Sequence, residues 1–253
     1  MKKAFIVTSV IEVNNDYPLT YNSVRSYFSN EERFRHTVMT IAALDQVSDA
    51  DTTIYVLDTS DHWQFYKDQL SYQKNLKFIS IKEEFPEILE TVKTHRQKSY
   101  CECLMISSFM QKYQAELFEN DYIFKMSGRY FIDGSFEPEL FNKYHTDRIF
   151  FKKHIQWEWK DNWFYSLVDR RKEQGDNYLR QYSSVLFGWG KEHHKHFMDI
   201  WLGMTSILSL PNMAHYDVET LLHYLTRPFE KDIIETDWTV YGWLGPNGQF
   251  TRY

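Results

Sequence analysis

Apolar runs and amphipathic segments alternate along the first 130 residues, and this alternation restricts the chain to few folds. Continuous apolar runs at 3–11, 52–60 and 76–81 are expected for strands buried on both faces of a sheet. A Ser-x-x-Glu capping box opens the helical pattern at 29–47. A further helix at 98–117 and a strand at 121–127 complete the series. Strands that alternate with helices predict an α/β class, a Rossmann-like, mostly parallel sheet flanked by helices.

The pattern changes after residue 135, where strand-like segments follow one another without long helices between them. We expect a mixed α+β C-terminal half, with strands at 147–159, 162–168 and 182–190 and helices at 191–208 and 217–226. No internal repeat or flexible linker separates the two parts. The sequence therefore predicts one compact domain with two halves, 1–135 and 136–253.

Composition excludes several classes of protein. A net charge of −6 argues against a broad nucleic-acid-binding face. The two cysteines, Cys101 and Cys103, are too few for a disulfide framework and lack further zinc ligands, which favours a reducing compartment. No apolar run reaches the roughly 18–20 residues of a membrane-spanning helix, and the N-terminus reads as a strand rather than a signal peptide. We expect a cytoplasmic protein.

Polar residues lie where the expected strands end, and these ends meet at one edge of a parallel sheet. Thr8 and Ser9 end the first strand, Asp58 ends the second, and Ser127-Gly128-Arg129 ends the fourth. Ligands of open α/β sheets bind outside the carboxyl ends of the strands. Gly128 permits close backbone approach, and Arg129 offers a planar cation suited to a diphosphate. A β-bulge at Gly128 with Arg129 paired to a carboxylate is equally compatible with the sequence.

Five segments together resemble bacterial GT-A glycosyltransferase-type proteins of capsule and lipopolysaccharide gene clusters. They are the first strand, the helix with ERFRHT, the strand that ends in Asp58, the helix with KSYCEC, and DYIFKMSGRY at 121–130. The resemblance covers about the first 135 residues and is looser beyond them. It implies a GT-A-like fold, in which 1–135 binds a nucleotide sugar and 136–253 binds the acceptor. It also implies transfer from a UDP-sugar to a saccharide, free or lipid-linked, in cell-surface polysaccharide synthesis.

The chain departs from the GT-A pattern at the position that usually carries an Asp-x-Asp metal motif. Ser127-Gly128-Arg129 stands there, so we expect no divalent metal and no other cofactor. Asp49-Ala50-Asp51 matches the Asp-x-Asp pattern. It precedes the second strand, however, and so belongs at the opposite edge of the sheet. Without a metal, cations must offset the charge of the diphosphate. The candidates are Arg129, Lys125, Lys98 and Arg96, with Arg33 expected to approach the nucleotide.

An acidic residue is needed as the general base of an inverting transfer, and three are candidates. Glu219 and Asp217 open the helix at 217–226, where related enzymes place an acidic residue. Asp217 also fits an N-cap, and Glu219 fits the first helical turn, so both have ordinary structural explanations. Asp133, in the turn after the strand-end motif, is the third.

Aromatic residues make up 18% of the chain, and some of them suit stacking on sugars. Trp157 and Trp159 share one face of an expected strand, which makes them candidates for acceptor binding, with core packing as the alternative. His193 and His196 share a helix face, but no further metal ligand is evident near them.

The sequence thus predicts a metal-independent, inverting glycosyltransferase, with retention not excluded. We expect no transmembrane segment, and peripheral attachment to the inner face of the membrane stays open. Two alternatives remain: a non-catalytic saccharide-binding protein on a degenerate transferase scaffold, and another nucleotide-using transferase such as a nucleotidyltransferase.

Overall fold

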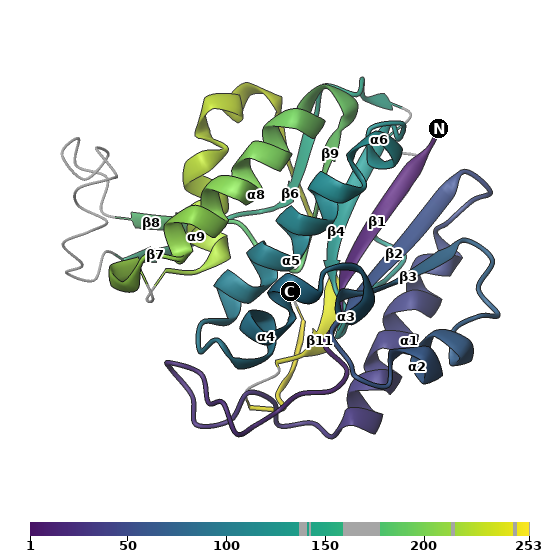
Figure 1. The fold of residues 1–253 in the computed structure, drawn as a ribbon. Coiled ribbons are helices and arrows are strands. Elements are labelled where there is room, and N and C mark those ends of the chain that lie inside the picture. Colours follow the sequence, from purple (N-terminus) through teal and green to yellow (C-terminus); the bar gives the residue numbers. More distant parts are fainter. Residues whose placement is uncertain (137–140, 142, 159–177, 214–215, 245–246, 253) are drawn as a thin grey trace.

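A seven-stranded sheet forms the centre of the molecule (Figure 1). A computed structural model describes residues 1–136, 141, 143–158, 178–213, 216–244 and 247–252. The strand order is β10-β6-β9-β4-β1-β2-β3. The strands are β1 (Lys3–Thr8), β2 (Thr52–Asp58), β3 (Leu76–Ser80), β4 (Tyr122–Ser127), β6 (Ile149–Lys152), β9 (Leu186–Gly190) and β10 (Ile233–Thr236). Neighbouring strands are parallel except at β9, which runs antiparallel to both β4 and β6.

Alternate side chains of the central strands enter two separate apolar clusters, one on each face of the sheet. On β1, Ala4 and Ile6 pack on one face, whereas Phe5 and Val7 pack on the other. All four are at most 1% exposed. Burial on both faces explains why this strand is a continuous apolar run in the sequence.

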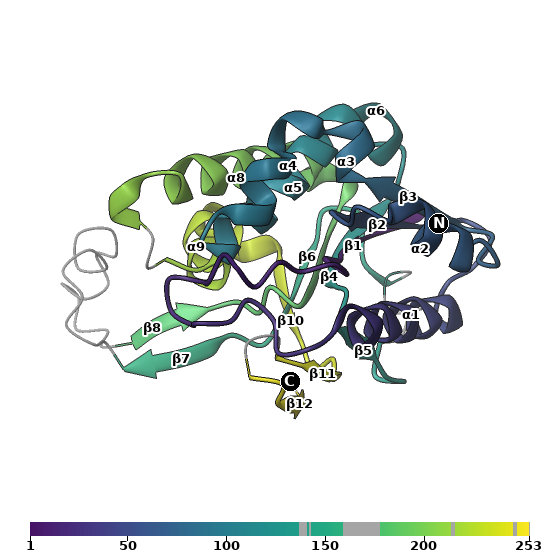
Figure 2. The ribbon, with the colours of Figure 1, turned by 60° about the horizontal axis from the view of Figure 1, so that its bottom comes forward.

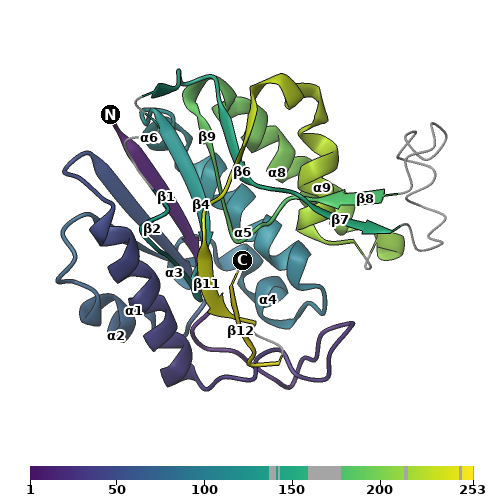
Figure 3. The ribbon, with the colours of Figure 1, turned by 180° about the vertical axis from the view of Figure 1, so that it is seen from behind.

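Helices cover one face, and helices with a small sheet cover the other (Figure 2). The first face is covered mainly by α4 (Pro86–Thr94), α5 (Lys98–Lys112), α8 (His194–Leu208) and α9 (Val218–Leu225). The second is covered by α1 (Asn30–Gln46), α2 (Trp63–Gln69) and the small sheet of β5 (Tyr130–Ile132), β11 (Val240–Trp243) and β12 (Phe250–Arg252). Figure 3 shows α1 and β11 in front of the main sheet.

Shorter elements complete the described chain. They are α3 (Ile81–Glu84), α6 (Gln114–Leu117), the 3₁₀ turns η3 (Lys191–His193), η4 (Pro211–Met213) and η5 (Arg227–Asp232), and the hairpin of β7 (Ile155–Glu158) and β8 (Tyr178–Gln181).

The expected α/β class with a mostly parallel sheet is confirmed. The helix expected at 29–47 begins at Asn30 with Ser29 as its N-cap, and the capping box with Glu32 is formed. Helix α4 and strand β10 were not anticipated, and the strand expected at 162–168 lies outside the described residues. Because β9, β6 and β10 extend the sheet that β1 to β4 begin, the two predicted halves share one sheet and one core.

Candidate active site

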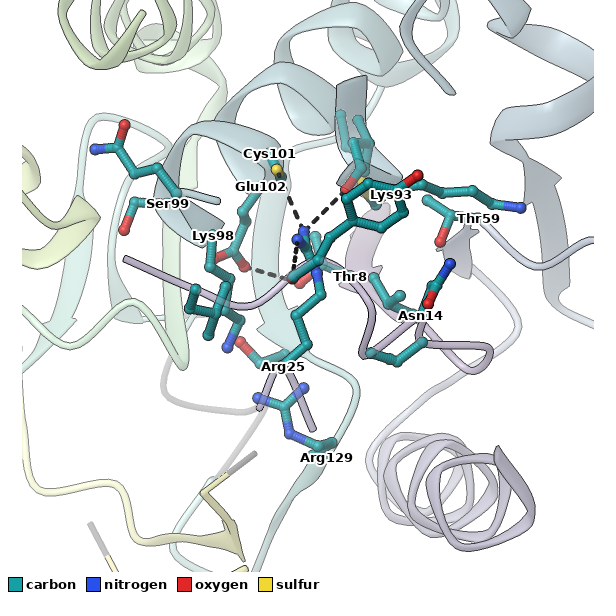
Figure 4. A pocket seen from close by; sticks show the side chains of 18 of the residues that line it. Thr8, Asn14, Arg25, Thr59, Lys93, Lys98, Ser99, Cys101, Glu102 and Arg129 are labelled. Carbon is teal, nitrogen blue, oxygen red and sulfur yellow. Dashed lines mark hydrogen bonds between the residues drawn. The ribbon is translucent and has the colours of Figure 1, made fainter. Parts of the chain in front are cut away.

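A large pocket lies at the edge of the sheet where β1 and β4 end (Figure 4). Its volume is about 1510 Å³, more than the roughly 300–1,000 Å³ typical of small-ligand sites. Its walls come from the loop between β1 and α1, the start of α5, the end of β4, the residues just before β9, and the start of α9. The pocket therefore has room for two substrates side by side.

Two cations, Lys98 and Arg129, point toward each other into this pocket (Figure 4). Arg129 donates from Nε to the carbonyl of Trp243 at 3.3 Å. Within the described part of the chain, neither cation forms an ion pair with a carboxylate at 4 Å or less. The positive charge of Arg129 and burial lower the pKa of Lys98 to about 7, against the weaker opposing effect of Glu102. Lys98 and Arg129 thus bring cationic groups to the pocket, with Glu102 and Glu219 near enough for their charges to act on Lys98.

Lys125 lies behind the pocket instead of facing it. Its side chain is fully buried and forms an ion pair with Glu102 at 2.6 Å. The ammonium also donates to Ser127 Oγ at 2.9 Å and to the Ser184 carbonyl at 2.5 Å, and Glu102 accepts from Thr8 Oγ1 at 2.9 Å. Burial opposes the change, but the charge of Lys125 holds the pKa of Glu102 below its usual value. Lys125 was predicted to lie in the donor site. In the structure its contacts instead link β4 to α5 and to the segment before β9.

Gly128 lies where the ends of β1 and β4 pack closely. Its N–H donates to the Thr8 carbonyl at 2.8 Å, and a Cβ at this position would meet that oxygen at 3.0 Å and the Cβ of Ser9 at 3.2 Å. Ser9 is itself buried, with its hydroxyl 2.9 Å from that of Thr37. Both residues were predicted to contact the donor, but neither lines the pocket.

Asp58 and Arg33 fix the loop that leaves β1. Asp58 is fully buried and accepts from the N–H groups of Ile11 at 2.9 Å and Ser60 at 2.8 Å. Burial raises the pKa of Asp58. Arg33 borders the pocket, where it donates to the Val10 carbonyl at 2.5 Å and to another loop group. Asp58 does not line the pocket, so its contacts are those of a structural carboxylate.

Two carboxylates of α9 enter the pocket from the C-terminal half. Asp217 is the N-cap of the helix and accepts from Thr220 N–H at 2.7 Å and from Gln181 Nε2 at 2.8 Å. Glu219 accepts a hydrogen bond from the Ser184 hydroxyl. Burial and the neighbouring charge of Asp217 raise the pKa of Glu219. A raised pKa suits a group that must take up a proton.

The remaining predicted site residues lie elsewhere. Asp133 accepts from Ser135 N–H at 2.9 Å beyond β5 and does not line the pocket. Trp157 lies on β7, paired with Leu179 of β8, and Trp159 lies outside the described residues. The predicted residues that do line the pocket are Thr8, Arg33, Lys98, Ser127, Arg129, Asp217 and Glu219.

Sequence reasoning missed several residues of the pocket. Arg25, in the loop after β1, donates to the carbonyls of Val92 at 3.2 Å and His95 at 2.9 Å and so ties the loop to α4. No periodic pattern marks a loop residue of this kind. Glu102 could have been found, because it lies four residues after Lys98 on the same helix face.

The fold, compared with known structures, matches a glycosyltransferase. The crystal structure of mouse xyloside xylosyltransferase 1 in its apo form is similar over 94% of this chain and 86% of that one, with a TM-score of 0.52 and 7% sequence identity. No family model and no curated protein sequence matches this chain. The chain thus shares the overall fold of that structure, with a mostly parallel sheet flanked by helices.

GT-A folds commonly imply a divalent metal, and the residues at the matching position do not fit one. Metal ions such as Mg²⁺ prefer oxygen ligands, whereas Ser127, Gly128 and Arg129 bring a cation to this place. Glu102, a carboxylate that lines the pocket, is already bound to Lys125 and Thr8. Across the described residues, no three His, Cys, Asp or Glu side chains gather as a metal site would require. Asp49 binds Lys3 at 2.8 Å at the opposite end of the strands, as its place before β2 predicted.

No helix in the described part of the chain has the length and apolar character needed to cross a membrane.

Proposed function

We propose that the protein is a glycosyltransferase that moves a sugar, of hexosyl type, from a UDP-sugar to a saccharide acceptor. The observation that carries the proposal is the pair of cations, Lys98 and Arg129, which line the pocket and form no ion pair with a carboxylate of the described residues, in a fold similar to that of a glycosyltransferase. Guanidinium and ammonium groups are the side chains that bind diphosphates directly. The similar mouse protein is named as a xylosyltransferase, which supports sugar transfer in general.

In the proposed reaction, the acceptor hydroxyl attacks the anomeric carbon of the donor sugar. Glu219 takes the proton of that hydroxyl, the new glycosidic bond forms, and the bond from the anomeric carbon to the diphosphate breaks. The electron pair of that bond leaves with UDP, whose added charge Lys98 and Arg129 stabilise. Direct displacement inverts the anomeric centre. Glu219 lines the same pocket in the first turn of α9, and its charge acts on Lys98, which suits it for this role.

We further propose that these cations take the place of a metal ion, so that no cofactor is needed. The acceptor is proposed to be a saccharide of a cell-surface polysaccharide or its lipid-linked precursor. Synthesis of this kind uses cytoplasmic nucleotide sugars, so the protein would act in the cytoplasm or at the inner face of the membrane.

Calorimetric titration with UDP, with and without EDTA, tests the proposal. Wild type should bind equally well in both conditions. Arg129→Ala should bind about tenfold to a hundredfold more weakly, because a hydrogen bond to a charged group contributes about 1.5–3 kcal/mol. Glu219→Gln should bind as wild type does but lose about 10²–10⁴-fold in turnover of an accepted donor. Binding that requires Mn²⁺ contradicts the metal-free site, and an undiminished rate in Glu219→Gln removes that residue as the base.

A non-catalytic saccharide-binding protein is the second candidate, favoured by the cation that stands in place of the metal motif. It predicts saccharide binding without UDP binding and no release of UDP from any UDP-sugar. A nucleotidyltransferase would need a metal site at this edge, and among the described residues no three His, Cys, Asp or Glu side chains gather as such a site would require.

A further inference from the structure

Two tyrosines of the loop between β1 and α1 face the pocket with their rings open to solvent. Tyr17 is 40% exposed and Tyr21 is 64% exposed, and both line the pocket. Large aromatic side chains exposed together at a pocket are uncommon on a protein surface and mark binding sites. Neither residue takes part in the donor chemistry described above.

Several contacts hold the backbone of the loop that carries these rings. Leu19, between them, is buried at 3% exposure and anchors the segment. Thr20 N–H donates to the Arg96 carbonyl at 3.1 Å, and Arg25 donates to the Tyr17 carbonyl at 3.1 Å. Since Arg25 also binds the end of α4, the loop is tied at several points. A ligand that stacks on these rings therefore loses little loop entropy on binding.

Tyr21, Glu219 and Arg129 line the same pocket, and the charges of the other two act on Tyr21. Partial burial and the negative charge of Glu219 raise the pKa of Tyr21, and the positive charge of Arg129 acts in the opposite direction. The phenol therefore lies within electrostatic range of the proposed base and of the proposed diphosphate site.

Rings and carboxylates in this arrangement suit a sugar. The apolar face of a pyranose packs on an aromatic ring, and a tyrosine keeps one polar end for hydrogen bonding. Asp217 and Glu219, which line the same pocket, present acceptors for sugar hydroxyl groups. A volume of about 1510 Å³ leaves room for a saccharide beside the nucleotide.

We propose that Tyr17 and Tyr21 form the acceptor subsite and bind a saccharide ring, with Tyr21 next to the reacting hydroxyl. This inference rests on the proposed function. It moves the acceptor site from the tryptophans of the β7 segment to the loop that follows β1.

Saturation-transfer NMR tests the subsite with methyl glycosides of glucose, galactose and xylose and with lactose, each in the presence of UDP. Wild type should transfer saturation to at least one of these sugars. Tyr17→Ala and Tyr21→Ala should weaken its binding roughly threefold to tenfold, the value of one aromatic contact, and Tyr21→Phe should retain it. Tyr72→Ala is the matched control, because Tyr72 is 59% exposed and does not line the pocket.

UDP titration of the same samples separates the two proposals. If UDP binds to wild type and to all variants while the Tyr17 and Tyr21 truncations lose the sugar, the subsite is supported. If UDP binds but no sugar does, or if the truncations bind sugar as Tyr72→Ala does, the subsite is wrong and the proposed function stands. A loss of UDP affinity in Tyr21→Ala would assign the ring to the donor and overturn the inference. No UDP binding to wild type overturns both.

Discussion

Lys98 carries a charge that the folded protein disfavours. The charge of Arg129 and burial lower its pKa to about 7, well below the roughly 10.4 of an unfolded lysine. Between these two pH values the unfolded chain binds the additional proton, so the free energy of unfolding rises with pH through this window. Below pH 7 both states are protonated and the destabilisation is complete. A side chain kept at such a cost is typical of a binding site.

Lys98→Met should therefore raise the melting temperature by a few degrees at pH 6, and the difference from wild type should shrink as the pH approaches 10. Thermal denaturation of the ligand-free protein across this range measures the effect. Lys74→Met, at an exposed position, should give no such pH-dependent difference. A variant that melts below wild type at pH 6 would show that Lys98 stabilises the fold.

Side-chain roles were predictable from the sequence only where they follow from the strand ends. Parallel strands share a carboxyl edge, so Thr8, Ser127 and Arg129 could be placed together, and all three line the pocket. The alternation of side chains along β4 predicts on which face of the sheet Lys125 lies. It does not predict that Lys125 is buried in an ion pair, because the partner Glu102 comes from another element. Gly128 and Tyr21 owe their roles to contacts between segments far apart in the chain, which no local pattern records.

At the scale of elements, β9 can pair with β4 because Gly188 of β9 has no side chain. Gly188 lies opposite Phe124 in the register, and a Cβ on Gly188 would come within 2.2 Å of the Phe124 ring. Since that ring is fully buried, it has nowhere to move without disturbing the core. The glycine here provides space for an aromatic neighbour.

Gly188→Ala should lower the free energy of unfolding by about 1–3 kcal/mol, the usual effect of overpacking a core. Gly134→Ala is the control, because no atom lies within 4 Å of a Cβ there, and it should be neutral or slightly stabilising. Urea denaturation of the two variants measures the contrast. Equal stabilities would mean that the Phe124 ring can shift freely.

The strands beyond residue 135 were harder to predict than those before it. In the first half each strand is a long apolar run next to a helix, so the sequence signal is strong. In the second half β6 and β10 are four residues each, and β9 contains two glycines. Their order in the sheet depends on pairing across the whole chain, as in the parallel pair β6 and β10.

At the scale of the whole molecule, the central sheet contains strands from both halves of the chain. One face of the core combines β1, β2 and α5 with Phe187, Trp189 and Trp201 from the second half. The pocket is divided in the same way, with cations from the first half and Glu219 from the second. Stability and the proposed activity should therefore depend on the same interface.

The full chain should unfold in one cooperative transition, with calorimetric and van't Hoff enthalpies equal. A fragment of residues 1–135 should show no cooperative transition, because β4 lacks its partner β9 and the cluster lacks large aromatic side chains. Differential scanning calorimetry of both proteins checks this. A fragment that melts cooperatively, or a full chain with two transitions, would show two independently stable units.

The antiparallel strand β9 also has a consequence for synthesis on the ribosome. One edge of β4 pairs with a strand that is made only after a further stretch of chain, from Ser127 to Gly190. At a synthesis rate of about 5–20 residues per second, the backbone groups of this edge stay unpaired for several seconds. During that time they could pair with another chain. A nascent chain halted in this interval would be the form most in need of a chaperone.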